Sequence, residues 1–230
     1  MKHVASRILL IIVVIMMVCF LTCDIFSIWD SRPLKFATSA VITLFGLTMI
    51  NKKDGRFISF ALIFTLTADV FLVLLNKYLY GVALFIIAQL LYSVYLTAIS
   101  CKTIWKELLK RVVPAAIAGF SAYAFGLGAN IALPAAYAVC IGVNIAHSIE
   151  LQHLKPCKNH LMLMFGFIIF ACGDICVGLR HLPPDVISQN VSSVLYLITW
   201  ITYPPSQLLI LASSNALNLK ISLAKKRASH

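Results

Sequence analysis

Charged residues are scarce in this sequence. It contains 19 Lys and Arg and 8 Asp and Glu among 230 residues, so 12% of the chain is charged, against about 25% in soluble domains, and 61% is apolar. So few charges cannot cover the surface of a soluble particle of this size, which excludes a long soluble helix, a nucleic-acid binder and a disordered chain. The composition indicates a polytopic membrane protein.

Motifs for disulfide pairing or metal binding are also missing. The seven cysteines form no CxxC pair and lie mostly within apolar segments, so neither a disulfide framework nor a zinc ribbon is indicated. A membrane zinc hydrolase needs three His near an Asp, but His147, His153 and His160 are expected on the cytoplasmic side, away from the intramembrane acids. We expect neither a metal nor a cofactor.

Long apolar runs define the fold. A spanning helix needs about 20 mostly apolar residues at 1.5 Å rise per residue. This length predicts an all-α transmembrane bundle of eight helices forming one domain over residues 1–230. The expected spans are 8–26, 34–50, 57–75, 80–100, 112–129, 131–147, 161–179 and 191–213.

Two regions are less regular than the rest. Between the fifth and sixth spans, Gly126, Gly128, Asn130 and Pro134 mark only a very tight turn, and the alternative over 112–147 is a single long helix with a re-entrant piece. The basic run from 102 to 111 is expected to be a connection, and residues 214–230 a short basic cytoplasmic tail.

Lys and Arg are distributed unequally between the two sides of the predicted bundle. Only Arg32, Lys35, Lys77 and Arg180 fall on one side, which leaves 15 of the 19 on the other. The positive-inside rule therefore predicts cytoplasmic N- and C-termini. The net charge of +11 is explained by topology and by contact with anionic membrane lipids, and no nucleic-acid partner is expected. Short loops favour a bacterial inner membrane, or the endoplasmic reticulum in a eukaryote; no oligomeric state is specified.

Two carboxylates fall inside predicted spans. Asp69 and Asp174 lie in FTLTADVFLVLL and FIIFACGDICVGL, whereas the other six acids are expected in loops: Asp24, Asp30, Asp54, Glu107, Glu150 and Asp185. An ionised group at the centre of a membrane helix costs at least ~2.5–3.5 kcal/mol, so such residues face a bundle interior or a wet cavity. The alternative is an interhelical hydrogen bond that only stabilises packing.

The two carboxylates are predicted at equal depth. Asp69 lies 12 residues after the start of its span and Asp174 lies 13 after the start of its own, and the two spans cross in the same direction. Both therefore lie about 18–20 Å from the cytoplasmic face. The two halves of the chain, four helices each, could form a parallel repeat.

Further polar residues are candidates for substrate binding. Arg32 and Lys35 stand at the outer end of the second helix, where a phosphate could bind, although a lysine at a helix end often extends to the interface. Pro204 and Pro205 interrupt the hydrogen-bond ladder of the eighth helix. The candidate binding residues are Arg32, Lys35, Gln89, Tyr92, Tyr203 and Gln207.

These residues carry a resemblance to the YhhN family of membrane proteins. The stretch Arg32-Pro33-Leu34, the segments ADVFLVLL and YLYGVALFIIAQLLYSVYL, and in the second half FGFIIFACGDICVG and TYPPSQLLILAS resemble that family's patterns over about residues 30–213. The chain departs from the family pattern at Ala68, where Gly is usual, at Gly173, which replaces Ser, and at Gln89, which replaces a His.

The resemblance implies an activity. Characterised family members are lysoplasmalogenases, which hydrolyse the vinyl-ether bond of lysoplasmalogens to a fatty aldehyde and glycerophosphoethanolamine or glycerophosphocholine. It implies that the two family acids are Asp69 and Asp174, as catalytic residues, and that Arg32, Tyr203 and Gln207 occupy family positions. An amide does not titrate, so Gln89 cannot transfer a proton as the family His could. The expected partners are a lysophospholipid substrate and membrane lipids.

A proton-coupled transporter or lipid permease is the alternative, because paired intramembrane acids serve that role equally well. Water-filled access to both faces would favour transport, and a pocket closed on the cytoplasmic side would favour hydrolysis. A third hypothesis is a non-catalytic assembly factor in which the acids only pack, so that Asn substitutions would harm folding rather than turnover.

Overall fold

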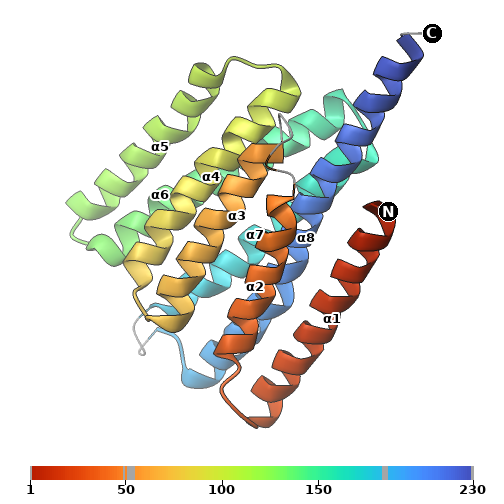
Figure 1. Ribbon diagram of the computed structural model, residues 1–230. Coiled ribbons are helices and arrows are strands. Elements are labelled where there is room, and N and C mark those ends of the chain that lie inside the picture. The colour runs from red at the N-terminus through yellow and green to blue at the C-terminus, as the bar shows by residue number, and fades with distance from the viewer. Residues whose placement is uncertain (1, 49, 51–54, 183–185, 229–230) are drawn as a thin grey trace.

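The computed structural model describes residues 2–48, 50, 55–182 and 186–228, and side chains from residue 7 to residue 214 within those ranges. Eight helices and no strand occur in these residues, as the sequence predicts (Figure 1). They are α1 (Lys2–Phe26), α2 (Arg32–Leu47), α3 (Gly55–Asp69) continued by the π-helical turn η1 (Val70–Leu74), α4 (Tyr78–Ser100), α5 (Ile104–Ala124), α6 (Ala129–Leu154), α7 (Lys158–Arg180) and α8 (Gln189–Ala228).

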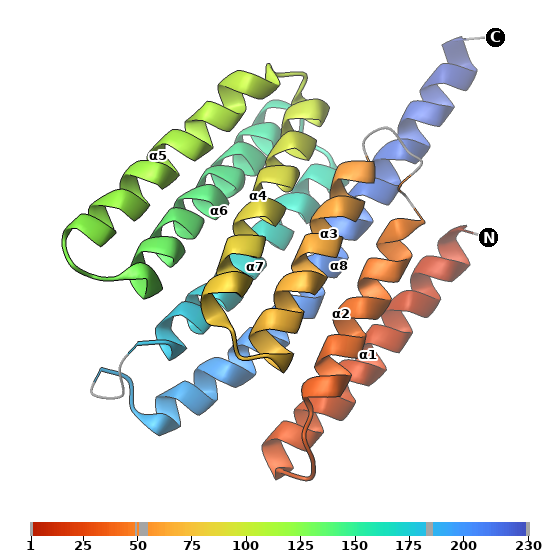
Figure 2. The same ribbon diagram turned by 60° about the vertical axis from the view of Figure 1, so that its left-hand side comes forward.

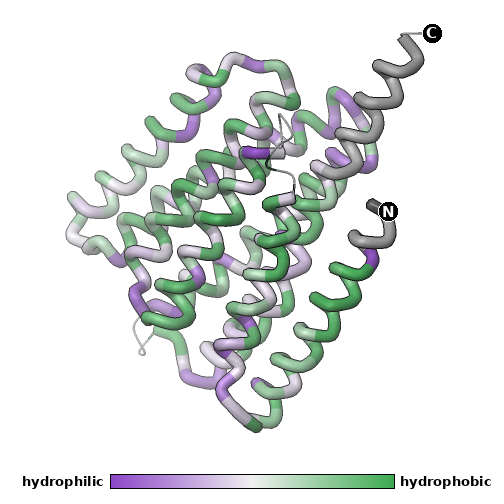
Figure 3. Tube along the Cα trace, in the orientation of Figure 1, coloured by the Kyte–Doolittle hydropathy of each residue, from purple (hydrophilic) through white to green (hydrophobic). Residues whose placement is uncertain are grey.

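Six of these helices are long and apolar enough to cross a membrane: α1, α3 with η1, α4, α6, α7 and α8. The two others differ for separate reasons. Helix α2 has 16 residues, about 24 Å at 1.5 Å per residue, which is short of a hydrocarbon core of roughly 30 Å. Helix α5 carries charged residues in its first two turns. Figure 3 shows hydrophobic residues along the helices and hydrophilic ones mainly at their ends.

The helices form two layers (Figures 1 and 2). One layer holds α5, α4, α3, α2 and α1 in that order, and the other holds α6, α7 and α8. Each half of the chain packs in sequence order, α1 to α4 and α5 to α8, and the halves meet through α4 with α6 and through α8 with α1, α2 and α3. The start of α1 and the end of α8 lie at one end of the bundle, here called the terminal end, and the opposite end is called the distal end.

The predicted connection over 102–111 is wrong, because α5 already begins at Ile104. Charges favour a helix here rather than a loop because they find partners along it. Glu107 pairs with Lys110 at 2.7 Å and with Arg111 at 3.3 Å, three and four residues further on, which is the spacing of neighbours on a helix face.

The turn predicted between the fifth and sixth helices is present. Gly126 and Gly128 both have positive φ, 79° and 72°, a conformation that glycine adopts without steric cost. Helices α5 and α6 are therefore separate and packed on each other, and the single long helix is wrong. Helix α8 runs through Pro204 and Pro205 and continues to Ala228, so most of the predicted tail is helical. Residues 215–228 are rich in Ala, Leu and Lys, which favour helix.

Candidate active site

Asp69 is the last α-helical residue of α3, immediately before the π-helical turn Val70–Leu74. Such a turn changes the helical register and is frequent at functional sites. The carboxylate of Asp69 is buried, and both of its oxygens lie within hydrogen-bond distance of the Tyr203 hydroxyl on α8, at 2.8 and 2.9 Å. A buried carboxylate is thus tied to a phenol from a helix more than a hundred residues away.

Asp174 lies two turns before the end of α7. One of its carboxylate oxygens accepts a short hydrogen bond from the hydroxyl of Tyr137 on α6. Each intramembrane carboxylate therefore has a tyrosine hydroxyl as its partner, Tyr203 for Asp69 and Tyr137 for Asp174. The two acids come from the third helix of each half of the chain, α3 and α7.

One cavity brings the two carboxylates together. A cavity of about 290 Å³ near the distal end is lined by both Asp69 and Asp174, and Tyr203 also contributes to its wall. The cations Arg32 and Arg180 line the same cavity, and His181 lies beside Arg180. The equal depth predicted from the sequence therefore corresponds to a shared site.

A second, mostly apolar cavity adjoins the first. It has a volume of about 340 Å³, lies between α4, α6 and α7, and is lined by residues such as Val82, Ile141 and Ala171. Asp174 and Phe85 line both cavities. A carboxylate thus lies where a polar compartment meets an apolar one, which is the arrangement that an amphipathic molecule requires.

Arg180 is a cation of the polar cavity that the sequence did not single out as a binding residue. Its guanidinium lies over the ring of Tyr196, 4.4 Å from the ring centroid, and its Nε atom is buried without a hydrogen-bond partner among the described residues. Its position six residues after Asp174 at the end of the same helix was visible in the sequence. That position alone does not make Arg180 a better candidate for substrate binding than the other cations of the distal end.

Arg32 lines the cavity but is already paired. Its guanidinium donates to the Asp30 carboxylate at 2.8–3.0 Å, and both side chains are about half exposed (47% and 53%). These hydrogen bonds from Arg32 hold the pKa of the Asp30 carboxyl group, which lies in the loop before α2, below its ordinary value.

Lys35 lies outside the lining of this cavity. Its ammonium is fully buried, 2.6 Å from the Asp24 carboxylate of α1 and 2.6 Å from the hydroxyl of Tyr196. It lies 5.7 Å from the ring centroid of Phe20 and 5.1 Å from that of Trp200. The Lys35 side chain therefore neither extends to the membrane interface nor is free to bind a phosphate.

Three more predicted binding residues lie outside both cavities. Gln89 is fully buried and donates to the hydroxyl of Tyr137, which in turn donates to Asp174, so Gln89 is connected to this acid through Tyr137. Tyr92 is fully buried with its ring edge-on to Phe167. Gln207 is buried one turn after Tyr203, and both polar atoms of its amide are without a hydrogen-bond partner among the described residues.

The placement of the other acids corrects the sequence-based prediction. Only Asp30 lies in a loop as expected, whereas Asp24, Glu107 and Glu150 lie in α1, α5 and α6, where each pairs with a cation. Asp54 and Asp185 lie outside the described residues. The sequence-based prediction assigned these acids to loops because they lie outside the apolar runs. It could not show their ion pairs, because the partner cation lies either on another part of the chain or on a neighbouring turn of the same charged helix.

No group of three or more His, Cys, Asp or Glu side chains that could hold a metal ion occurs in the part of the chain that the structure describes. The polar side chains that line the cavity include two carboxyl groups, two phenols, two guanidinium groups, the imidazole of His181 and the amide of Asn76. Comparison with known proteins found no match among curated proteins and none among solved structures. The sequence pattern of the YhhN family, however, matches residues 30–214, which include every residue of the two cavities, and the chain belongs to this family.

Proposed function

We propose that this protein hydrolyses the vinyl-ether bond of lysoplasmalogens, with Asp69 and Asp174 carrying out the proton chemistry. The observation that carries the proposal is that two intramembrane carboxylates from distant helices line one cavity together with arginines. Membership of the YhhN family supports it, because the family pattern extends over the same residues and the resemblance to that family implies a lysoplasmalogenase activity.

The two compartments fit a single-chain lipid. The fatty chain occupies the apolar cavity between α4, α6 and α7, and the phosphate of the headgroup binds Arg180 in the polar cavity. Arg180 is better suited to this role than Lys35, because its Nε is unpaired whereas the Lys35 ammonium is held by Asp24. This orientation places the vinyl-ether bond near Asp174, where the two compartments meet.

The reaction consumes one water molecule. A protonated carboxyl group delivers its proton to the β-carbon of the vinyl ether, which leaves an oxocarbenium cation at the carbon bonded to oxygen. The second carboxylate stabilises this cation and orients the water that attacks it. The resulting hemiacetal then collapses to a fatty aldehyde and the free glycerophospho alcohol. Desolvation and mutual repulsion oppose ionising both of two neighbouring acids in a site of low dielectric. One acid therefore stays protonated and can donate the proton, while the other is ionised and can stabilise the cation.

The packed bundle interior between the polar cavity and the terminal end favours hydrolysis over transport. The residues that line the polar cavity come from the distal halves of their helices. Beyond them the bundle interior is filled by fully buried side chains, apolar ones such as Leu62, Leu96 and Phe167 and polar ones such as Gln89 and Asn144. A lipid hydrolase needs access from one side only, whereas a transporter needs access from both.

The test uses purified protein in detergent with lysoplasmenylethanolamine, and aldehyde release is followed through a coupled dehydrogenase. We expect the wild type to release aldehyde and Asp69→Asn and Asp174→Asn each to lose at least about 100-fold in rate, since a group active in general acid–base catalysis typically contributes 10²–10⁴-fold.

Two controls accompany this test. Glu150→Gln changes an acid whose carboxylate pairs with Lys102 on the surface, and it should keep the wild-type rate. The alkyl-ether analogue of the substrate has no double bond to protonate and should release nothing. Activity that survives in both Asp variants would rule out the proposed mechanism, and loss of folded protein in both would favour a packing role for the acids.

A further inference from the structure

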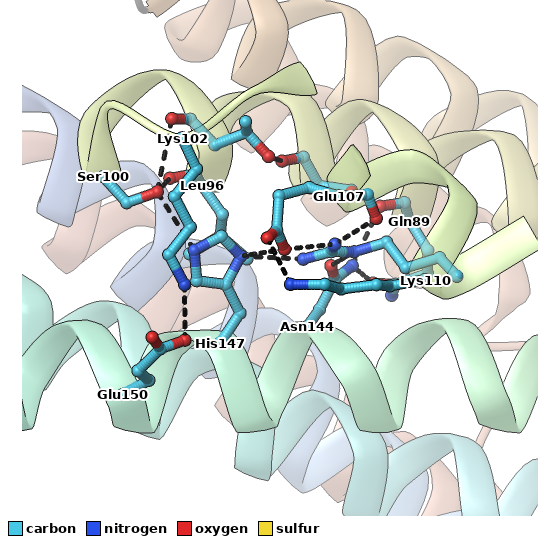
Figure 4. A network of polar contacts seen from close by, with 12 residues as sticks. Gln89, Leu96, Ser100, Lys102, Glu107, Lys110, Asn144, His147 and Glu150 are labelled. Carbon is cyan, nitrogen blue, oxygen red and sulfur yellow. Dashed lines mark hydrogen bonds and ion pairs between the residues drawn. The ribbon is translucent and has the colours of Figure 1, made fainter. Parts of the chain in front are cut away.

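A chain of hydrogen-bonded polar side chains begins directly behind Asp174. Tyr137 donates to Asp174, and the Nε2 of Gln89 donates to the Tyr137 oxygen at 3.2 Å. The Nδ2 of Asn144 donates to the Oε1 of Gln89 at 2.9 Å, and the Nε of Arg111 donates to the Oδ1 of Asn144 at 2.9 Å. Figure 4 shows Gln89 and Asn144 in the part of this chain near α5. The chain connects α7 with α6, α4 and α5.

The whole chain is buried. Gln89, Asn144 and Arg111 are 0% exposed and Tyr137 is 8% exposed. In such surroundings a hydrogen bond that is lost is not replaced by one to bulk water, so each donor depends on its acceptor in the chain. The direction of each bond is therefore as important as its presence.

Arg111 fixes the donor-to-acceptor direction of the hydrogen bonds at the end of the chain remote from Asp174. A guanidinium has five N–H donors and no acceptor, so the Asn144 atom facing Arg111 must be its oxygen. Three further hydrogen bonds hold the guanidinium, to the backbone oxygen of Glu107 at 2.6 Å, the Glu107 carboxylate at 3.3 Å and the Nδ1 of His147 at 2.8 Å (Figure 4). The guanidinium is thus held in one orientation.

The direction then passes from residue to residue. With its oxygen towards Arg111, Asn144 presents its NH₂ group to Gln89, where it also donates to the backbone oxygen of that residue at 2.8 Å. The side-chain oxygen of Gln89 is used as acceptor, so its NH₂ group faces Tyr137. Tyr137 accepts from Gln89, and its own proton is directed to Asp174.

We propose that Arg111, Asn144 and Gln89 are positioning residues that keep Tyr137 as a hydrogen-bond donor to Asp174, and that Tyr137 in turn fixes this carboxyl group at the junction of the two cavities. The amides of Gln89 and Asn144 donate and accept but do not titrate, so the chain transmits hydrogen-bond direction rather than protons. The effect on turnover rests on the proposed function, whereas the effect on Asp174 itself does not.

The direction can be reversed by one substitution of nearly unchanged shape. In Asn144→Asp the new carboxylate accepts from Arg111, which keeps it ionised, but it cannot donate to Gln89. The Gln89 amide then turns its NH₂ group towards residue 144 and its oxygen towards Tyr137, which draws the phenol proton away from Asp174. The matched control is Asn144→Leu, which removes all three hydrogen bonds of the Asn144 side chain and imposes no direction on Gln89.

Activity and stability are expected to rank these variants in opposite orders. Asn144→Asp keeps the partner of the buried Arg111, so its thermal midpoint in detergent should exceed that of Asn144→Leu. Its kcat should nevertheless be the lower of the two, close to that of Tyr137→Phe, which we expect to lose roughly 10²-fold with little change in KM. A purely structural role predicts the same order for both measurements, with Asn144→Leu the worse, and this result would overturn the proposal. So would full activity in Tyr137→Phe, a readout that does not depend on the folding of the Asn144 variants.

A second measurement needs no substrate. Dicyclohexylcarbodiimide is an apolar reagent that modifies protonated carboxyl groups, and peptide mass spectrometry separates Asp174 from Asp69. Loss of the Tyr137 donor should speed modification of Asp174 in Tyr137→Phe and Asn144→Asp, while Asp69, which Tyr203 contacts, reacts as in the wild type. Equal rates at Asp174 in all variants would contradict the proposal. Failure of the wild type to release aldehyde would instead count against the proposed function. The rates of Asp174 modification would then still test whether the chain positions Tyr137.

Discussion

Arg180 differs from the neighbouring cations because its Nε atom has no hydrogen-bond partner among the described residues. Lys35 is neutralised by Asp24, and Arg32 is held by Asp30. The Nε of Arg180 is buried and unpaired beside the two carboxylates, with only the Tyr196 ring against its guanidinium plane. A buried donor without an acceptor is costly unless a ligand completes it, which is why we propose Arg180 as the phosphate-binding cation.

Substitution of Arg180 should therefore affect substrate binding more than turnover. A hydrogen bond to a charged group contributes about 1.5–3 kcal/mol, so we expect Arg180→Gln to raise KM roughly 10- to 100-fold with little change in kcat. The assay is aldehyde release at varied concentrations of lysoplasmenylethanolamine. Arg32→Gln is the matched comparison and should have the smaller effect, because Asp30 already binds its guanidinium.

A phosphate-free substrate separates charge recognition from a general disturbance of the cavity. With a 1-alkenylglycerol, wild type and Arg180→Gln should have similar KM values. An equal loss for both substrates would show that Arg180 supports the cavity rather than the phosphate.

At this scale the sequence analysis named the two acids and Tyr203, as a candidate binding residue, but it did not indicate Tyr137. Asp69 and Asp174 are conspicuous because a carboxylate in an apolar span is costly wherever it points. Tyr137 gives no such signal, since a tyrosine fits an apolar helix and only the fold brings its hydroxyl to Asp174. The same holds for Arg111, which lies in a basic run typical of a connection but is fully buried against α6 through Asn144.

Two glycines allow α7 and α8 to pack closely, and these helices hold Asp174 and Tyr203. A Cβ atom on Gly166 would lie 2.7 Å from Cγ1 of Ile210 and 3.2 Å from the backbone nitrogen of that residue. A Cβ on Gly173 would lie 2.7 Å from the hydroxyl oxygen of Thr202. Small residues at such positions let membrane helices approach closely, so the distance between the elements of the site depends on them.

Gly166→Ala should therefore lower stability by about 1–3 kcal/mol, the usual cost of an added methyl group in a packed interior. Gly142→Ala in α6 is the matched control, because a Cβ there meets nothing within 4 Å. Alanine also favours a helix over glycine by up to about 1 kcal/mol, so the control should be as stable as the wild type or more so. Thermal unfolding in detergent measures both, and equal midpoints for the two variants would contradict close packing at Gly166.

The elements themselves were predictable in number but not in extent. Eight apolar runs predict eight helices, of which six are long and apolar enough to cross a membrane. A helix continues beyond its apolar run wherever its polar residues find partners. Glu107 with Arg111 extends α5 towards its start in this way, and Lys102 with Glu150 joins the start of the α5 region to the last turns of α6. These pairs depend on helix neighbours, which hydropathy along one chain does not reveal.

At the scale of the whole molecule, the charge distribution and the position of the cavity are connected. The positive-inside rule predicts that the terminal end lies in the cytoplasm, and the polar cavity lies near the distal end, with Asn76 and His181 from the segments that follow η1 and α7 in its wall. If this orientation holds, the cavity faces the non-cytoplasmic leaflet, and the headgroup enters and the water-soluble product leaves on that side.

Labelling of two cysteines with a membrane-impermeant maleimide tests this orientation. Cys101 is exposed in the connection between α4 and α5 at the terminal end, and Val186, 59% exposed before α8, can be replaced by cysteine at the distal end. In intact cells we expect Val186→Cys to be labelled at residue 186 and Cys101 to react only after permeabilisation. Cys19 and Cys172, exposed on membrane-spanning helices, should stay unreactive in both states because lipid disfavours the thiolate. Peptide mass spectrometry distinguishes the sites, and labelling of Cys101 before permeabilisation would place the cavity and its product on the cytoplasmic side.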